Sequence, residues 1–252
     1  MKKLLLPFIA LAMVMLMDSC TTAKQIPYFQ NIDSISLAGS KGLFDAKIMP
    51  KDQLNITVHT SDPAAASPFN LSVSRTLGTG GSFSTGGGSL QTYLVENDGT
   101  INFPVVGKLH VVGLTKSECE QLIQEKVKPY MAKSENPVVT VKMASYRVTM
   151  LGALGARVIP VTTEKMSILE AIASAGDLSI YGKRTNVMLI REDATGMKSV
   201  HRFNLTDANI FNDPYYYLQQ NDIIDVEPNK VKAKNSSIGS STTIWFSFIS
   251  IV

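Results

Sequence analysis

Apolar and polar residues alternate with a period of two in several short runs along the chain, which is the pattern of half-buried β-strands. The runs that follow it lie at 54–58, 93–95, 100–103, 137–141, 146–151, 158–161, 187–190, 200–205 and 223–226. The Asn-Asp-Gly sequence at 97–99 favours positive φ angles, so it predicts a hairpin between 93–95 and 100–103. We therefore expect a chain rich in strands.

Helical spacing occurs at two places, and each begins with the same N-terminal signal. Residues 115–118 and 167–170 both carry a hydroxyl residue followed three positions later by Glu, which predicts a capping box that opens a helix. Pro129 is expected to end the first helix and Gly176 the second. Cys119 lies on the apolar face of the first helix, so we expect it to pack in a core rather than act as a nucleophile.

The predicted elements divide into two units and indicate an α+β fold. Residues 44–144 hold the first four strands and the longer helix, whereas residues 145–229 combine the remaining strands with one short helix. Prolines and a glycine-serine tract predict a flexible insertion at 61–91. A nucleotide-binding loop is not expected there, because no Lys-Ser or Lys-Thr pair follows the glycines.

The N-terminal residues have the features of an export signal. Two lysines, an apolar run at 4–17 and a small residue before Cys20 predict a signal peptide at 1–19. The apolar run is shorter than the roughly 20 residues that a transmembrane helix needs, so a permanent span is the weaker alternative. Residues 20–43 are polar and interrupted by glycine, which predicts a linker between Cys20 and the first unit.

Charge and cysteine content limit the classes of partner. The chain has 24 Lys and Arg against 21 Asp and Glu, which gives a net charge of +3. Loss of residues 1–19 lowers this charge to about +2, which is too small to indicate a nucleic-acid partner. Only Cys119 then remains beside Cys20, so we expect no intramolecular disulfide.

The sequence contains no recognisable catalytic pattern. None of the three histidines has a second ligand at metal-binding spacing, and no Gly-x-Ser-x-Gly sequence occurs. The nearest carboxylate pairs, 118 with 120 and 192 with 193, lie in a capped helix and in a turn, which argues against a glycosidase. We therefore expect no enzymatic activity and no cofactor or metal.

Three consecutive tyrosines, Tyr215, Tyr216 and Tyr217, are candidate glycan contacts. Each offers an apolar ring with a polar tip, which suits stacking against a sugar. The alternative is that these side chains fill an interface or the edge of a core.

Residues 230–252 begin with three lysines and end in an apolar stretch that predicts a membrane-associated tail. On a helix, at about 100° per residue, five hydroxyl residues fall within about 80° of arc. These candidate pore-lining residues are Ser236, Ser240, Thr243, Ser247 and Ser250, and the candidate lipid-facing residues are Ile238, Trp245, Ile249 and Val252. A helix over 236–252 is only about 25 Å long against about 30 Å for a bilayer core, so a β run or a peripheral anchor is the alternative.

The first unit resembles the export domain of the Wza-like outer-membrane polysaccharide-export proteins. Residues 50–58 follow the family pattern PGDxLxIxV, residues 98–115 follow DGxIxxPxxGxxxVxGxT, and residues 137–141 follow PxVxV. Lys51 stands where the first pattern has glycine.

The second unit resembles the soluble-ligand-binding β-grasp domain, abbreviated SLBB. Residues 167–177 follow the pattern tixeAixxAGG, residues 187–191 follow VxxiR, and residues 221–226 follow GDxixV. Asp177 and Asn221 stand at two positions where these patterns have glycine.

This resemblance implies a non-enzymatic subunit of a homo-oligomeric ring that exports capsular polysaccharide or exopolysaccharide. The residues before Cys20 resemble the lipobox of Bacteroides-type lipoproteins, which implies a lipid anchor in the outer membrane on the periplasmic side. In the family, C-terminal helices of several subunits form a barrel, a role that 236–252 would take here. The implied partners are the polysaccharide chain and an inner-membrane chain-length regulator of the Wzc-like type. The alternative is a monomeric periplasmic glycan-binding envelope lipoprotein.

Overall fold

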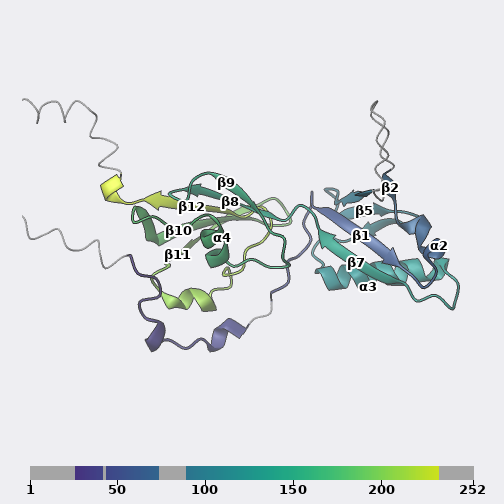
Figure 1. Ribbon diagram of the computed structural model, residues 1–252, viewed down its shortest axis with the longest axis horizontal. Helices are drawn as coiled ribbons and strands as arrows, with labels where there is room; N and C mark the ends of the chain where they lie inside the picture. Colours follow the sequence, from purple (N-terminus) through teal and green to yellow (C-terminus); the bar gives the residue numbers. More distant parts are fainter. Residues whose placement is uncertain (1–25, 42–43, 74–88, 233–252) are drawn as a thin grey trace, which may run out of the picture.

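The computed structural model describes residues 26–41, 44–73 and 89–232, which form two domains side by side along the long axis (Figure 1). Each domain has its own cluster of buried apolar side chains. The proposed lipidation site Cys20 and the predicted pore-lining and lipid-facing residues at 236–252 lie outside the described residues. Within the described ranges, no helix combines the length and the apolar character needed to cross a bilayer.

The first domain is built on a three-stranded antiparallel sheet in the order β4-β1-β7. Its strands are β1 (Gln53–His59), β4 (Thr92–Leu94) and β7 (Val138–Met143). The expected alternation holds in β1, where Leu54, Ile56 and Val58 are buried and the residues between them are not. Helix α3 (Lys116–Val127) packs against β7 and covers this apolar face.

The predicted capping box of α3 is present. The Thr115 amide donates to Glu118 Oε2 at 2.8 Å, and the Glu118 amide donates to Thr115 Oγ1 at 3.3 Å. The α-helix ends before Pro129, which lies in the short 3₁₀ helix η6 (Lys128–Tyr130). Cys119 is completely buried, and this burial raises its thiol pKa to about 12, so the core role predicted for it is confirmed.

The predicted hairpin between 93–95 and 100–103 is wrong. β4 pairs with β1, whereas β5 (Thr100–Phe103) pairs with β6 (Gly107–His110) across a turn at 104–106. The turn after β4 does form, because the Glu96 amide donates to the Thr100 carbonyl at 2.8 Å. The ladder does not extend into β4, which pairs with the central strand β1.

The segment predicted as a flexible insertion, 61–91, contains structure at both of its ends. α2 (Pro63–Ala66) and η5 (Ser67–Phe69) follow β1, and β2 (Ser72–Val73) pairs with β3 (Ser89–Leu90). Phe69 is 2% exposed and belongs to the core of the first domain. Burial of this ring stabilises the start of the segment, which composition alone did not indicate. Residues 74–88 lie outside the described residues.

The second domain contains a five-stranded mixed sheet in the order β11-β10-β12-β8-β9. Its strands are β8 (Arg147–Gly152), β9 (Arg157–Pro160), β10 (Gly182–Glu192), β11 (Lys198–Phe203) and β12 (Ile223–Pro228). β12 is the last strand of the described chain, yet it lies at the centre, parallel to β8 and antiparallel to β10. Helix α4 (Ile168–Ser174), with the predicted capping box, packs on the same core, so the two domains have the expected mixed α+β character.

The described part of the predicted linker packs against the second domain. Its two 3₁₀ helices, η3 (Ile32–Ser34) and η4 (Ala38–Lys41), lie beside η7 (Ala208–Asn212) of the second domain. The Phe29 amide donates to the Leu205 carbonyl at 3.2 Å, and the Phe29 ring lies 4.9 Å from the Phe211 ring. The chain enters the first domain only afterwards, where the Ile48 amide donates to the Leu114 carbonyl.

Three residues that replace a family glycine have left-handed backbone conformations. The φ angles are 69° at Lys51, 64° at Asp177 and 61° at Asn221. Glycine adopts this region without steric cost, whereas a side chain raises the free energy there, least for Asn and Asp. The fold thus keeps the turn geometry of the glycine pattern although the residues differ.

Candidate functional site

The two domains meet at a pair of matching turns. The first turn precedes β1 and has Lys51 in its left-handed position. The Asp52 amide donates to the Met49 carbonyl at 3.2 Å, and the Asp52 carboxylate accepts the Met49 amide at 2.8 Å. Both hydrogen bonds close the same four-residue turn, so the buried carboxylate fixes the geometry with which the chain enters the sheet.

The second turn precedes β12 and repeats this arrangement. Asn221 has the left-handed conformation, the Asp222 amide donates to the Gln219 carbonyl at 3.2 Å, and the Asp222 carboxylate accepts the Gln219 amide at 2.7 Å. Asp222 is also completely buried. The aspartates of the PGD-like and GD-like sequences therefore have the same structural role, one in each domain.

The two turns are in direct contact. The Gln220 side-chain amide nitrogen donates to Asp52 Oδ2. The side-chain oxygen of Gln220, Oε1, is buried without a hydrogen-bond partner within the described structure. Ser145, in the short connection between the domains, donates to the other oxygen of the Asp52 carboxylate at 3.4 Å. Burial raises the Asp52 pKa to about 6, against the opposing effect of these hydrogen bonds.

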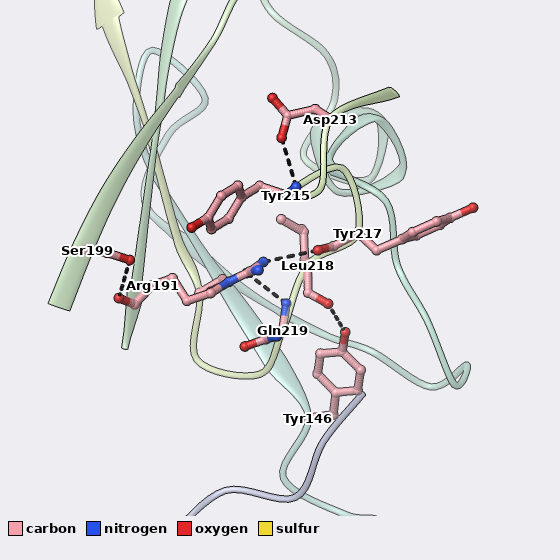
Figure 2. A network of polar contacts seen from close by, with 9 residues as sticks. Tyr146, Arg191, Ser199, Asp213, Tyr215, Tyr217, Leu218 and Gln219 are labelled. Atoms are coloured by element: carbon pink, nitrogen blue, oxygen red, sulfur yellow. Dashed lines mark hydrogen bonds and ion pairs between the residues drawn. The ribbon is translucent and has the colours of Figure 1, made fainter. Parts of the chain in front are cut away.

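Arg191 joins the second turn to the tyrosine segment, as Figure 2 shows. From β10, its guanidinium donates to both carboxylate oxygens of Asp222, at 3.0 and 2.7 Å, and to the Tyr217 carbonyl at 3.0 Å. Burial raises the Asp222 pKa, and the ion pair with Arg191 opposes that effect. This one side chain therefore holds the carboxylate of the turn and the backbone of the tyrosine segment together.

The three candidate glycan contacts are half-buried, and each ring has protein neighbours. Tyr215 stacks on His201 with ring centroids 4.5 Å apart, and the Arg191 guanidinium lies 5.1 Å from the Tyr215 ring (Figure 2). His201 is itself held by Asp213, whose carboxylate lies 2.8 Å from the imidazole Nε2. Glycan stacking on the Tyr215 ring would therefore compete with these protein contacts.

Tyr217 and Tyr216 lie between the second domain and the chain that leads into the first. Tyr217 stacks on Phe44 at 5.3 Å, and the Lys165 ammonium lies 5.1 Å from the Tyr217 ring. Tyr216 lies against the rings of Tyr217 and Phe211. Protein packing of the tyrosines, which the sequence left as an alternative, therefore accounts for most of the contacts that these rings make.

Two clefts lie at the junction of the domains. One has a volume of about 410 Å³ and is lined by both domains, with Lys116 of α3 forming an ion pair with Glu164 across it. The other, of about 400 Å³, is lined by polar groups that include Lys51, Asp193 and Asn221. Among the described residues, no cluster of three or more His, Cys, Asp or Glu side chains could hold a metal ion.

Comparison with known proteins identifies the first domain. Residues 44–144 match the family model described as polysaccharide biosynthesis/export protein. The first domain is therefore a domain of the polysaccharide export family. The capsule polysaccharide export outer membrane protein CtrA of Neisseria meningitidis serogroup B is 28% identical over 140 residues, which cover 56% of this chain and 34% of that protein. CtrA of serogroup A matches at the same identity, and the chain spans about a third of the length of both relatives.

The family-like patterns of the sequence explain which of the site residues could be found in advance. Asp52, Asp222 and Arg191 all fall inside the family-like patterns of the sequence, although no function could be given to them from the sequence. Gln220 carried no such signal, because its role depends on a contact with a residue 168 positions away. The family description names biosynthesis and export, and the CtrA relatives are described as export proteins, which suggests a transport function.

Proposed function

We propose that this chain is a lipoprotein subunit of an oligomeric channel that exports capsular polysaccharide or exopolysaccharide across the outer membrane. The match of residues 44–144 to the export family carries this proposal, and the capsule-export function of the CtrA relatives supports it. In this proposal Cys20 carries the lipid, the second domain is an SLBB-type β-grasp domain, and 236–252 forms part of the pore.

The firm connection between the two domains supports a role as a building block of a ring. The two turns touch through Asp52 and Gln220, and Ser145, in the connection between the domains, also donates to Asp52. Beside this junction, within the second domain, the Tyr146 hydroxyl donates to the Leu218 carbonyl at 2.6 Å (Figure 2). Subunits that keep one fixed angle between their domains can repeat it around a closed symmetric assembly. In this role the first domain would face the Wzc-like regulator of the inner membrane.

Mass measurement in mild detergent tests the assembly. The full chain, extracted with its membrane anchor, is expected to migrate as a closed ring of many subunits. A monomer would contradict the channel and support the alternative of a monomeric glycan-binding envelope lipoprotein. Deletion of the gene in its host tests the export function separately, and loss of surface or secreted polysaccharide that a plasmid copy restores is the expected result.

The predicted pore lining has its own test. Replacing Ser240 and Ser247 together by Leu is expected to block export without preventing lipidation, because water-filled pores need polar walls. The matched control replaces Ile238 and Ile249, on the predicted lipid-facing side, by Leu. Normal polysaccharide on cells with the serine double variant would refute the lumen assignment.

A further inference from the structure

Both ends of the described chain meet the same short segment of the second domain. The Tyr28 hydroxyl donates to Asp177 Oδ1 at 2.5 Å, and the Tyr28 ring lies 5.1 Å from the Arg184 guanidinium. At the other end, Asn229 donates through its backbone amide to the Tyr181 carbonyl at 2.6 Å and through its side chain to the Ile180 carbonyl at 3.0 Å. Figure 1 shows both described ends on the side of the molecule away from the first domain.

This segment presents two large apolar side chains to solvent. A turn links α4 to β10, closed by the Gly182 amide donating to the Ser179 carbonyl at 3.0 Å. The two central positions of the turn are Ile180, which is 59% exposed, and Tyr181, which is 37% exposed. Exposed turns usually take Gly, Asn, Asp, Ser or Pro at such positions, so these side chains need an explanation other than turn formation. We call residues 179–182 the apolar turn.

A buried arginine, Arg184, holds the backbone of the apolar turn in place. Arg184 is 5% exposed, and its guanidinium donates to the Leu178 carbonyl at 2.5 Å and to the Ser179 carbonyl at 3.2 Å. The Tyr181 amide also donates to the Ser179 hydroxyl at 3.3 Å. These contacts fix the backbone on which Ile180 and Tyr181 stand, so the two side chains are displayed without a further ordering cost.

The surroundings of the apolar turn are basic. Lys230 and Lys232 are exposed just beyond Asn229, and Lys234 follows them in the sequence. Lys183 is also exposed and lies 3.2 Å from Glu227. Lysines beside exposed apolar and tyrosine side chains form the combination found at the interface of a bilayer with anionic lipid, each basic residue contributing about 1 kcal/mol of attraction.

The sequence beyond both ends is the second argument for a bilayer. Five residues lie between Cys20 and Ile26, so the α-carbon of Cys20 can lie no more than about 20 Å from the described chain, at about 3.5 Å for each of the six residue steps. Beyond Lys232, seven of the nine residues at 244–252 are apolar or aromatic, the exceptions being Ser247 and Ser250. The described chain thus ends, at both termini, on the side that carries the apolar turn (Figure 1).

We propose that the apolar turn inserts Ile180 and Tyr181 into the surface of a phospholipid bilayer, so that the second domain rests on the membrane at this point. The exposed lysines would bind the anionic headgroups around it. The inference shares only the membrane anchor with the proposed function and does not depend on the export channel. A monomer in detergent would refute the channel and leave this contact intact.

A single reporter tryptophan tests the contact in the full chain. Trp245 is the only tryptophan, so Trp245→Phe provides a background in which Tyr181→Trp can be read alone. After reconstitution into phosphatidylethanolamine and phosphatidylglycerol vesicles, we expect blue-shifted emission that brominated lipid quenches severalfold. Val138→Trp in the same background is the matched control, because Val138 is 57% exposed on β7 of the first domain. Its emission should not respond to brominated lipid.

Three results would overturn the proposal. Equal quenching of the two reporters would show that the turn is no closer to lipid than the first domain. If the emission of the Tyr181→Trp reporter were blue-shifted without lipid, and more so at higher protein concentration, the turn would contact a second copy of the chain rather than a bilayer. Failure of the full chain to associate with vesicles would rule out a bilayer as the partner of the turn. As a second variant, Ile180→Ser with Tyr181→Ser should lower vesicle partition about tenfold, equivalent to 1.4 kcal/mol, whereas Val138→Ser should leave it unchanged.

Discussion

Gln220 of the second domain donates its side-chain amide to the buried carboxylate of Asp52 in the first domain. Each residue belongs to a turn that an aspartate closes, so the contact joins the starting points of β1 and β12. A change at this contact should therefore act on the angle between the domains as well as on the local fold.

Removal of the Asp52 carboxylate should destabilise the protein strongly. Asp52→Ala leaves the Met49 amide and the Gln220 side chain without their acceptor, and we expect a loss of about 2–3 kcal/mol in the free energy of unfolding. Urea denaturation followed by circular dichroism measures it. The control is Asp98→Ala, because Asp98 closes an exposed turn and its removal should lower the free energy of unfolding far less. Equal losses in both variants would contradict the structural role of Asp52.

The same carboxylate should make stability depend on pH. Its pKa rises from 3.8 to about 6 in the folded protein, so the folded state binds the proton more tightly than the unfolded chain. Stability is therefore highest with the proton bound and falls as pH rises from about 4 to about 6, by about 3 kcal/mol if this group acts alone. Unfolding measured across this range in wild type checks the expectation.

Asp52→Asn should flatten that pH dependence and fold nearly as well as the wild type does at low pH. The introduced amide nitrogen can take the place of Oδ1, where the Ser145 hydroxyl can accept from it, while the retained oxygen still accepts from the Met49 amide and the Gln220 side chain. If the asparagine variant kept the wild-type slope between pH 4 and 6, Asp52 would not be the group that titrates.

Glycine at position 51 should stabilise the protein. Lys51 has a φ of 69°, where a lysine side chain costs about 1 kcal/mol relative to glycine, so Lys51→Gly should raise the free energy of unfolding by about that amount. Asn221→Gly should change it less, because Asn tolerates the region. Lys142→Gly, in the extended strand β7, is the control and should destabilise by about 0.5–1 kcal/mol. Thermal unfolding of the three variants ranks them.

Arg191 should be essential for the second domain. Arg191→Ala leaves Asp222 buried without its cation and should cost about 3–5 kcal/mol. Combining Arg191→Met with Asp222→Asn should recover part of that loss, since the uncompensated charge is then gone. Urea unfolding of the single and double variants provides the comparison. A double variant less stable than Arg191→Ala would show that most of the lost stability comes from the missing ion pair and not from the burial of a lone charge.

Local signals in the sequence predicted local structure well. The hydroxyl and carboxylate three residues apart at Thr115 and Ser167 marked both helix starts, because a capping box needs only neighbours in the chain. The prediction of strand pairing failed where the partner was distant in the sequence. β5 was the nearby candidate for β4, yet β4 bonds to β1, about forty positions earlier. Phe69 was missed for the same reason, since its burial depends on a core formed by other segments.

The candidate site was harder to predict than the fold. The tyrosines at 215–217 were conspicuous in the sequence, but a run of aromatic residues does not tell whether their rings meet sugar or protein. The structure gives Tyr215 and Tyr217 protein neighbours on the second domain and on Phe44. Asp52 was visible in the PGD-like pattern, whereas its partner Gln220 could be recognised only once the two domains were placed together.

The packing of the N-terminal segment on the second domain has a consequence for the order in which the protein assembles. Asn31 bonds to Asp207 and to the Ala208 amide, which lie 176 and 177 residues later in the chain. During synthesis these partners emerge late, so residues 26–41 can dock only after the chain has been made to residue 208. Closure of this contact therefore reports that most of the second domain is present, and a chain truncated before residue 207 would keep residues 26–41 undocked.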